Sequence, residues 1–194
     1  SSEDVFIAKI SASGSDLLYS TFIKESFQQF SGLMLGKDGD VYAAGYTRSG
    51  NSEITPNAYD TSYNGGAFDG VVMKLDSTLS TLQFATYIGG SGDDLIYGLD
   101  LDENDNILIV GYTTSADYPI TSAALDSTLD GATDVVLSIL DSSGAMLSYS
   151  TYLGSSSNDY AYYSVDYRQG AIYIAGGTDG SDLPVTTDAL DPTY

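Results

Sequence analysis

A stretch of apolar residues that begins with aspartate occurs three times, and this repetition constrains the fold more than any other feature. The three copies are Asp4-Val-Phe-Ile-Ala-Lys-Ile10, Asp69-Gly-Val-Val-Met-Lys-Leu75 and Asp134-Val-Val-Leu-Ser-Ile-Leu140. The spacing is 69 − 4 = 65 and 134 − 69 = 65 residues. A fixed period of this size is typical of repeat architectures. We therefore predict one repeat domain over 1–194, with repeats at approximately 1–66, 67–131 and 132–194.

Each repeat contains four segments with the character of β-strands, followed by a loop of about twenty residues with proline and polar residues. The first strand is apolar on both faces, and the second alternates apolar and polar residues with a period of two. The predicted strands, in order within the repeats, are Val5–Ile10, Val71–Leu75 and Val135–Leu140; Leu17–Ile23, Leu82–Ile88 and Leu147–Leu153; Phe30–Leu35, Ile96–Leu101 and Tyr162–Tyr167; Val41–Thr47, Ile107–Thr113 and Ile172–Thr178.

Short turns separate these strands. Ser13-Gly14 lies between a first and a second strand, and Asp38-Gly39 lies between a third and a fourth. Such dipeptides are hairpin signals, so neighbouring strands should be antiparallel. Four antiparallel strands with two apolar faces describe one blade of a β-propeller, because blades cover one another. We therefore predict an all-β fold in which each 65-residue repeat forms one four-stranded antiparallel sheet, with a three-fold trefoil- or prism-like β fold as the alternative.

Glycine recurs inside the fourth strand, at Gly45, Gly111 and Gly176. A glycine in a strand interior usually marks a bend or the close approach of another backbone. We interpret these three glycines as positions of tight packing.

Many short elements keep one order and one period along the chain. Among them are Tyr149-Ser-Thr-Tyr-Leu-Gly154, Gly89-Gly-Ser-Gly-Asp-Asp94, Asn106-Ile-Leu-Ile-Val-Gly-Tyr-Thr113 and Asp117-Tyr-Pro119. In these elements the sequence resembles the bacterial seven-bladed β-propeller repeat family, SBBP, over essentially its whole length. The resemblance implies an exported or cell-surface protein of propeller type, often one module of a large adhesin-like chain. It implies no defined ligand and no catalytic residues.

The number of repeats bears on the partners of the chain. Three repeats of 65 residues fill the 194 residues, whereas propellers typically have four to eight blades. We therefore expect further blades from a longer chain, a homo-oligomer that completes the ring, or a head-to-tail polymer. Two copies would give six blades.

Composition excludes several functions. Six basic and 27 acidic residues give a net charge of −21, which repels nucleic acid and anionic lipid. Cysteine and histidine are both absent, so disulfides, thiolate nucleophiles and imidazole bases are excluded. No apolar run reaches the roughly 20 residues of a membrane helix, so we expect no membrane insertion. The acidity and the absence of cysteine favour an extracellular or cell-surface location.

Tyrosines supply the candidate ligand-binding residues. There are 17 of them, and Tyr160, Tyr162 and Tyr163 lie close together in the sequence, while Tyr97 has the corresponding position one repeat earlier. Aromatic rings stack on sugars, which suggests a glycan site. The alternative is packing between blades with the hydroxyl reaching water, the commoner use of tyrosine in β-proteins.

A second candidate is a calcium site. Asp102, Asn104 and Asn106 offer oxygen ligands at alternate positions of one turn, a spacing that resembles the start of a calcium loop. The downstream bidentate glutamate is missing, and the alternative is a polar hairpin turn held by the aspartate side chain. Apart from calcium, we expect no cofactor.

No catalytic residues are predicted. Asp93 and Asp94 could form a carboxylate pair for glycoside chemistry, but adjacent residues of an extended segment point to opposite faces. We expect Asp94 and Asp159 to accept bonds from backbone N–H groups at turns instead. The chain is thus predicted to be a non-enzymatic β-propeller module for structural assembly or adhesion. A lectin-like propeller is the alternative, and an enzyme acting on extracellular polysaccharide is the less favoured one.

Overall fold

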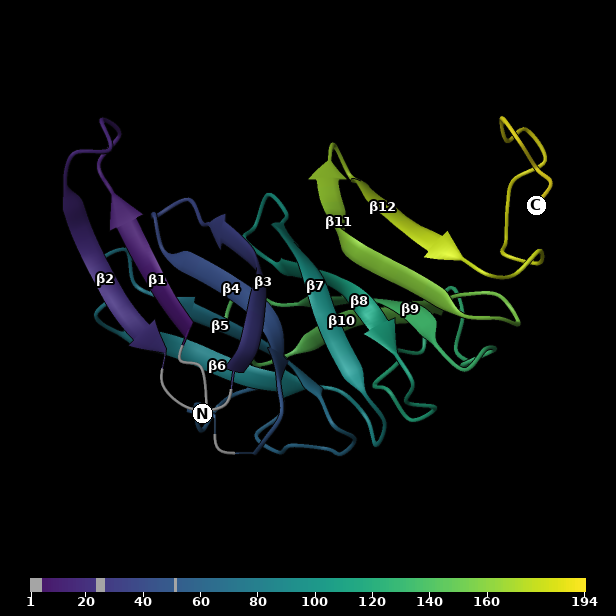
Figure 1. Cartoon of the computed structure of the whole chain (residues 1–194), viewed down its shortest axis with the longest axis horizontal. Helices are drawn as coiled ribbons and strands as arrows, with labels where there is room; N and C mark the ends of the chain where they lie inside the picture. Colours follow the sequence, from purple (N-terminus) through teal and green to yellow (C-terminus); the bar gives the residue numbers. More distant parts are fainter. Residues whose placement is uncertain (1–4, 24–26, 51) are drawn as a thin grey trace.

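The computed structural model describes residues 5–23, 27–50 and 52–194, and in them the chain is built from β-strands (Figure 1). Each strand predicted from the sequence lies within an observed strand. The described part contains no helix long and apolar enough to cross a membrane. The strands are β1 (Val5–Ile10), β2 (Leu17–Ile23), β3 (Phe27–Leu35), β4 (Val41–Thr47), β5 (Asp69–Leu75), β6 (Leu82–Ile88), β7 (Asp94–Leu101), β8 (Ile107–Thr113), β9 (Asp134–Leu140), β10 (Leu147–Leu153), β11 (Asp159–Arg168) and β12 (Ala171–Thr178).

The strands form four antiparallel sheets, which confirms the all-β, propeller-type fold. Two sheets have four strands, in the orders β3-β4-β5-β6 and β7-β8-β9-β10, and we call them sheet one and sheet two. The other two are the hairpins β1–β2 and β11–β12. Figure 1 places these hairpins on opposite sides of sheets one and two.

The sequence predicted four-stranded sheets, but the expectation that the four strands of one repeat share a sheet was wrong. Each four-stranded sheet combines the third and fourth strands of one repeat with the first and second strands of the next. The long loop, which includes residues 52–68, joins the hydrogen-bonded strands β4 and β5. The short segment 89–93 passes from sheet one to sheet two. The strands on the two sides of the long loop pair with each other, so this loop is not a boundary between sheets.

The two central strands of sheet one, β4 and β5, are buried on both faces, as a propeller blade requires. Tyr42 and Ala44 face sheet two and pack there with Ile96 and Ile109, among others. Val41 and Ala43 alternate with them and form a second cluster with Ile7 of the β1–β2 hairpin. Sheet two is likewise covered on its other face, where Val110 and Val135 pack with Ala161 of β11. The apolar contact between consecutive sheets therefore supplies most of the core.

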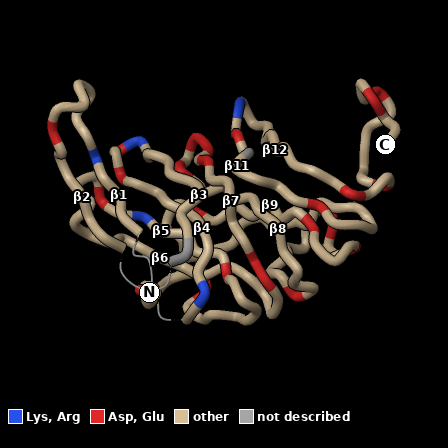
Figure 2. The backbone as a smooth tube through the Cα atoms, viewed as in Figure 1, with Lys and Arg blue, Asp and Glu red and all other residues tan. Residues whose placement is uncertain are grey.

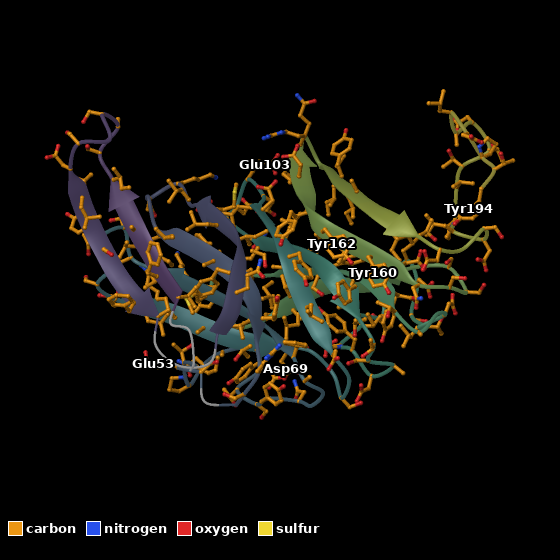
Figure 3. The ribbon with its side chains drawn as sticks, in the orientation of Figure 1. Glu53, Asp69, Glu103, Tyr160, Tyr162 and Tyr194 are labelled. Carbon is orange, nitrogen blue, oxygen red and sulfur yellow. The ribbon has the colours of Figure 1, made fainter. Side chains whose placement is uncertain are left out.

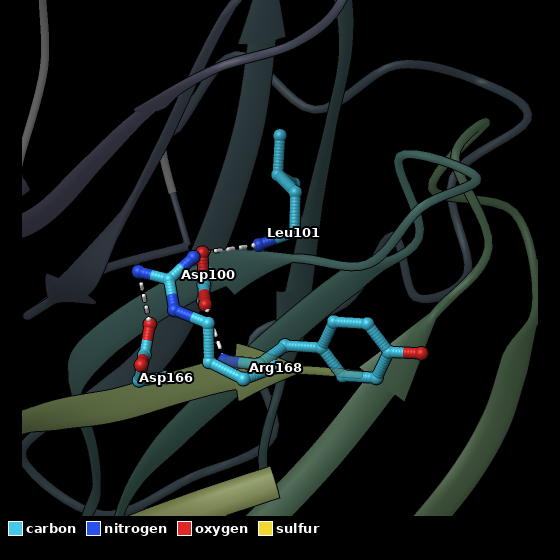
Figure 4. Close-up of polar contacts among 5 residues, drawn as sticks. Asp100, Leu101, Asp166 and Arg168 are labelled. Carbon is cyan, nitrogen blue, oxygen red and sulfur yellow. Dashed lines mark hydrogen bonds and ion pairs between the residues drawn. The ribbon is translucent and has the colours of Figure 1, made fainter. Parts of the chain in front are cut away.

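A polar contact also joins sheet two to the β11–β12 hairpin (Figure 4). The buried Asp100 carboxylate of β7 accepts a hydrogen bond from the Tyr167 backbone N–H at 2.6 Å and another from the Leu101 N–H at 2.8 Å. On the exposed side of β11, Arg168 forms an ion pair with Asp166 at 3.1 Å. Acidic residues are spread along the described chain, with few basic residues between them (Figure 2).

Candidate functional site

Six tyrosine side chains from four strands meet where β3, β7 and β11 lie next to one another. Four of them, Tyr97, Tyr160, Tyr162 and Tyr163, were predicted from the sequence, and the structure brings all four together. Tyr97 is central, with its ring centroid 5.4 Å from those of both Tyr162 and Tyr163. The full set, called here the tyrosine cluster, is Tyr46, Tyr97, Tyr112, Tyr160, Tyr162 and Tyr163.

A bulge in β11 explains how two adjacent residues reach the same neighbour. The register of β11 and β12 shifts between Ala161 and Val165. Within this bulge Tyr163 has a φ of 57°, in the left-handed region that non-glycine residues rarely adopt. In a regular strand successive side chains point to opposite faces. The bulge removes this alternation, so Tyr162 and Tyr163 both contact Tyr97.

The cluster presents neutral aromatic surface with hydroxyl groups. Tyr162 and Tyr163 are 47% and 59% exposed, while Tyr97, Tyr112 and Tyr160 are partly buried beneath them. Tyr160 and Tyr162 stack at 5.9 Å with an angle of 12° between the rings, and Figure 3 shows them side by side on β11. Burial, followed by the nearby Tyr112 and Tyr46, raises the pKa of Tyr97 above its ordinary value. Its hydroxyl therefore stays protonated at neutral pH.

Gln29 of β3 fixes two hydroxyl groups at the rim of the cluster. Its amide nitrogen donates to the Tyr163 hydroxyl at 3.1 Å, and its amide oxygen accepts from the Tyr46 hydroxyl at 3.1 Å. Sequence reasoning missed Tyr46 and Tyr112. Both follow the recurring strand glycine, in Gly45-Tyr46 and Gly111-Tyr112, and this repeated dipeptide is the pattern that could have identified them.

The predicted calcium ligands lie in the turn between β7 and β8. The Asp102 carboxylate accepts from the backbone N–H groups of Asn104 at 2.7 Å and Asn106 at 2.9 Å. It also accepts from the Asn106 side-chain amide at 2.8 Å. These bonds are those of an aspartate that holds a hairpin turn. Across the described residues, no three or more histidine, cysteine, aspartate or glutamate side chains are grouped so as to hold a metal ion.

Aspartates at the starts of strands hold the short segments between sheets. Asp94, at the start of β7, is fully buried and accepts from the Gly90 N–H at 2.8 Å, the Ser115 hydroxyl at 2.9 Å and the Thr113 hydroxyl. Asp159, at the start of β11, accepts from the N–H and hydroxyl of Ser155 at 2.6 and 2.8 Å. This confirms the prediction that Asp94 and Asp159 bind turn N–H groups.

Strands β5 and β9, which are the first strands of their repeats, also begin with buried aspartates. Asp69 is labelled in Figure 3 and accepts from the Asn64 N–H, and Asp134 accepts from the Asp130 N–H at 2.9 Å. Burial raises the pKa of Asp69 to about 7 and that of Asp94 to about 6, and it raises the pKa of Asp134. These carboxyl groups lie inside the fold, where they accept hydrogen bonds from the segments that lead into the strands.

A polar hollow between loops contains two further carboxylates, those of Asp60 and Asp117. Both accept hydrogen bonds within the protein. Asp60 accepts from the Asn64 amide at 2.6 Å, and Asp117 accepts from the N–H and hydroxyl of Ser91 at 2.8 and 2.9 Å. The Ser91 bonds lower the pKa of Asp117, which makes it a poor proton donor.

Comparison with known proteins agrees with the geometry. Residues 83–119 match the family model described as a β-propeller repeat, SBBP. These residues comprise most of β6, all of β7 and β8, and the turns between them. No curated protein matches the chain. The match shows a β-propeller repeat of the SBBP type at residues 83–119, and the stacked antiparallel sheets agree with a propeller-type fold.

Proposed function

We propose that this chain is a non-enzymatic structural module, acting in assembly or adhesion, whose outermost sheets are completed by further blades or by other chains. The observation that carries the proposal is the contrast between its sheets. Sheets one and two have four strands each, with central strands that are buried on both faces. By contrast, β1–β2 and β11–β12 are half-sheets with exposed apolar side chains. Phe6, Leu17 and Phe22 of the first hairpin are each about two-thirds exposed. Exposed apolar surface of this kind marks an interaction site.

An extracellular or cell-surface location belongs to this proposal. The net charge of −21 and the absence of cysteine support it, because such a chain needs no reducing compartment and repels nucleic acid. The absence of an enzymatic role is also part of the proposal. It is supported by the two carboxylates of the polar hollow, Asp60 and Asp117, which are engaged by Asn64 and Ser91.

The size of the purified chain in solution tests the assembly role. We expect light scattering after size exclusion to give a mass well above the 20.4 kDa of one copy at micromolar concentration. The association should strengthen between 50 and 500 mM NaCl, because salt screens the repulsion between chains of charge −21. A monomer at every concentration and salt level would contradict self-assembly.

Glycan binding is the second candidate, and the tyrosine cluster favours it. Two exposed rings, Tyr162 and Tyr163, stand over a partly buried ring, Tyr97, and hydroxyl groups lie at the rim. Flat aromatic surface beside hydroxyl groups suits the apolar face and the polar edge of a sugar ring. The cluster carries no charge, so a neutral sugar fits it better than an acidic one.

A glycan array tests this second candidate. We expect binding to neutral glycans that falls at least tenfold in Tyr162→Ala and Tyr163→Ala. Tyr194→Ala is the matched control, because Tyr194 is 78% exposed and lies outside the cluster. No signal on the array, or equal losses in all three variants, would remove the lectin hypothesis.

A further inference from the structure

Tyrosine is the side chain of this protein that one-electron oxidants attack. The sequence has 17 tyrosines and no tryptophan, cysteine or histidine, and its three methionines react by oxygen transfer instead. An oxidised tyrosine loses one electron and one proton and becomes a neutral phenoxyl radical. Two such radicals combine through the ring carbons next to the hydroxyl-bearing carbon and give dityrosine. The placement of the rings therefore decides which tyrosines are joined.

Tyr97 and Tyr163 are in contact across the boundary between sheet two and the β11–β12 hairpin. Their ring centroids are 5.4 Å apart, within the range of packed aromatic pairs, and the ring planes form an angle of 73°. The ladders of the described strands run within sheet two and within the hairpin, and none joins the one to the other. A bond between these two rings would add a covalent link where strand pairing supplies none.

The angle between the two rings favours coupling. In dityrosine the two hydroxyl groups flank the new bond and crowd each other, so the ring planes are twisted apart. Tyr97 and Tyr163 already have this twist. The stacked pairs Tyr97–Tyr112 and Tyr160–Tyr162 have angles of only 24° and 12°. A stacked pair would have to rotate out of its packed contact before it could couple.

Tyr163 suits coupling to Tyr97 better than the adjacent Tyr162 does. The Tyr162 ring also lies 5.4 Å from Tyr97, at an angle of 68°. It is held in addition by its stacking on Tyr160 and by an edge contact with Tyr112. Among the described rings, Tyr163 contacts that of Tyr97 and no other. A radical on Tyr163 therefore has one ring partner, whereas a radical on Tyr162 has three.

The backbone at both residues allows the rings to approach. The register of β7 against β8 shifts at Tyr97, and the register of β11 against β12 shifts over the segment that contains Tyr163. Both residues thus lie in bulges, where a residue is left out of the ladder. A small shift of either bulge can bring the rings to bonding distance without breaking a paired position.

Gln29 holds the oxygen of Tyr163. Its side-chain amide nitrogen donates a hydrogen bond to the Tyr163 hydroxyl oxygen at 3.1 Å. This bond does not use the proton of Tyr163, so it persists when that proton leaves, and it keeps the ring in place during oxidation. The Tyr163 side chain is 59% exposed, so its proton can pass to water and a diffusible oxidant can reach the ring.

We propose that one-electron oxidation joins Tyr97 to Tyr163 as a dityrosine and thereby fastens sheet two to the β11–β12 hairpin. The oxidant is hydrogen peroxide acting through a peroxidase. Tyr163 is oxidised first, takes an electron from Tyr97 through the ring contact, and is then oxidised again. This modification does not depend on the proposed assembly role.

The bond forms with balanced atoms and electrons. Each phenol gives up one electron and one proton, and a carbon–carbon bond then forms between the two rings. The hydrogen on each bonded carbon moves to the oxygen of its ring, which restores both phenols. One molecule of hydrogen peroxide accepts the two electrons and two protons and becomes two molecules of water. The product is two hydrogen atoms lighter than the starting chain.

Peptide mapping of the oxidised chain tests the bond. The unmodified protein is treated at low concentration with a peroxidase and limiting hydrogen peroxide, and the monomer is recovered from a denaturing gel. Cleavage before aspartates places Tyr97 in the fragment 94–99 and Tyr163 in the fragment 159–165. We expect dityrosine fluorescence in the monomer and these two fragments joined in one species, two hydrogen atoms lighter than their sum. Tandem mass spectrometry of this species identifies which tyrosine of 159–165 carries the bond.

Phenylalanine variants test the choice of partner, because phenylalanine keeps the ring but is not oxidised in this way. Tyr163→Phe and Tyr97→Phe should each lower the dityrosine in the monomer at least tenfold. Tyr162→Phe changes the adjacent residue of the same bulge and is the matched control, and it should keep more than half of the product. Unfolding temperatures before oxidation that match that of the unmodified chain would show that the variants fold.

The unfolding temperature of the oxidised monomer tests the fastening. The bond closes a loop of 163 − 97 = 66 residues in the unfolded chain. By the chain-entropy argument used for disulfides, we expect the unfolding temperature to rise by about 10 °C relative to the unoxidised chain.

Three results would overturn the inference. Dityrosine in the monomer without a link between 94–99 and 159–165 would show that other rings couple. An equal loss of product in Tyr162→Phe would show that the contact of Tyr163 with Tyr97 does not select the pair. Covalent dimers without dityrosine in the monomer would show that coupling occurs between chains and not across this boundary.

Discussion

Replacing Gly111 by alanine should lower the free energy of unfolding by about 3 kcal/mol or more. The free energy of unfolding of a typical domain is roughly 5 to 15 kcal/mol, so this is a large loss. A Cβ at Gly111 would lie 1.9 Å from the Leu95 carbonyl oxygen, inside any allowed contact. That oxygen belongs to β7, where the ladder with β8 shifts register between Ile96 and Gly98. The neighbouring atoms are backbone, so they cannot move aside as a flexible side chain would. Denaturant unfolding measures the loss.

Gly177→Ala is the matched control for this experiment. It lies in β12, has no atom within 4 Å of a built Cβ, and takes the position that Tyr46 and Tyr112 occupy in the equivalent strands. We expect a change within about 0.5 kcal/mol. If Gly111→Ala were equally mild, β7 and β8 would not approach each other as described.

The free energy of unfolding should rise by about 2 to 4 kcal/mol when the pH is lowered from 8 to 5. Burial raises the pKa of Asp69 to about 7 and that of Asp94 to about 6, from an ordinary value of 3.8. The folded state therefore binds protons in this range that the unfolded state does not. For Asp69, the difference between about 7 and 3.8 corresponds to about 4 kcal/mol. This contribution is complete below pH 3.8 and is lost as the pH rises through 7.

Other carboxylates set the lower limit of this range. Hydrogen bonds, first from the Thr78 hydroxyl and then from the Thr81 N–H, lower the pKa of Asp76 to about 2. Its contribution to stability is present above pH 3.8 and is lost as the pH falls toward 2. Maximum stability is thus expected at about pH 4 to 5.

Thermal unfolding at several pH values, with two variants, tests the account of Asp69. Asp69→Asn should remove the larger part of the dependence between pH 5 and 8, because the amide does not titrate, and should leave the smaller part due to Asp94. Asp188→Asn is the control: a hydrogen bond from Thr186 lowers the pKa of Asp188, so its loss should leave the slope above pH 5 unchanged. An unfolding temperature of the unmodified chain that falls on acidification from pH 8 to 5 would refute the prediction.

Period and alternation predicted the strands of this chain but not the membership of its sheets. Strands and turns are recognised from the order of apolar and polar residues within a short stretch of sequence. Whether β4 pairs with β5 depends on contacts between strands that the long loop separates in the sequence. The residues of the loop do not indicate this pairing. For the same reason the sequence predicted the role of Asp94 at its turn, which involves the nearby Gly90.

The tyrosine cluster shows the same division. Tyr160, Tyr162 and Tyr163 are neighbours in sequence, and Tyr97 is related to them by the repeat, so the period could identify all four. Tyr46 and Tyr112 enter the cluster from β4 and β8, which requires knowledge of how consecutive sheets are stacked. The bulge at Tyr163, which turns two adjacent rings to one side, has no marker in the sequence, because a non-glycine residue carries the positive φ.

The offset between repeat and sheet has a consequence for how such chains change in length. Each 65-residue unit contributes the last two strands of one sheet and the first two strands of the next, counted along the chain. Duplicating or deleting a unit anywhere in the series therefore creates or removes one whole sheet, and the hairpins at the two extremities stay as they were. Gene duplication can therefore lengthen the series of sheets without any change in how neighbouring strands pair.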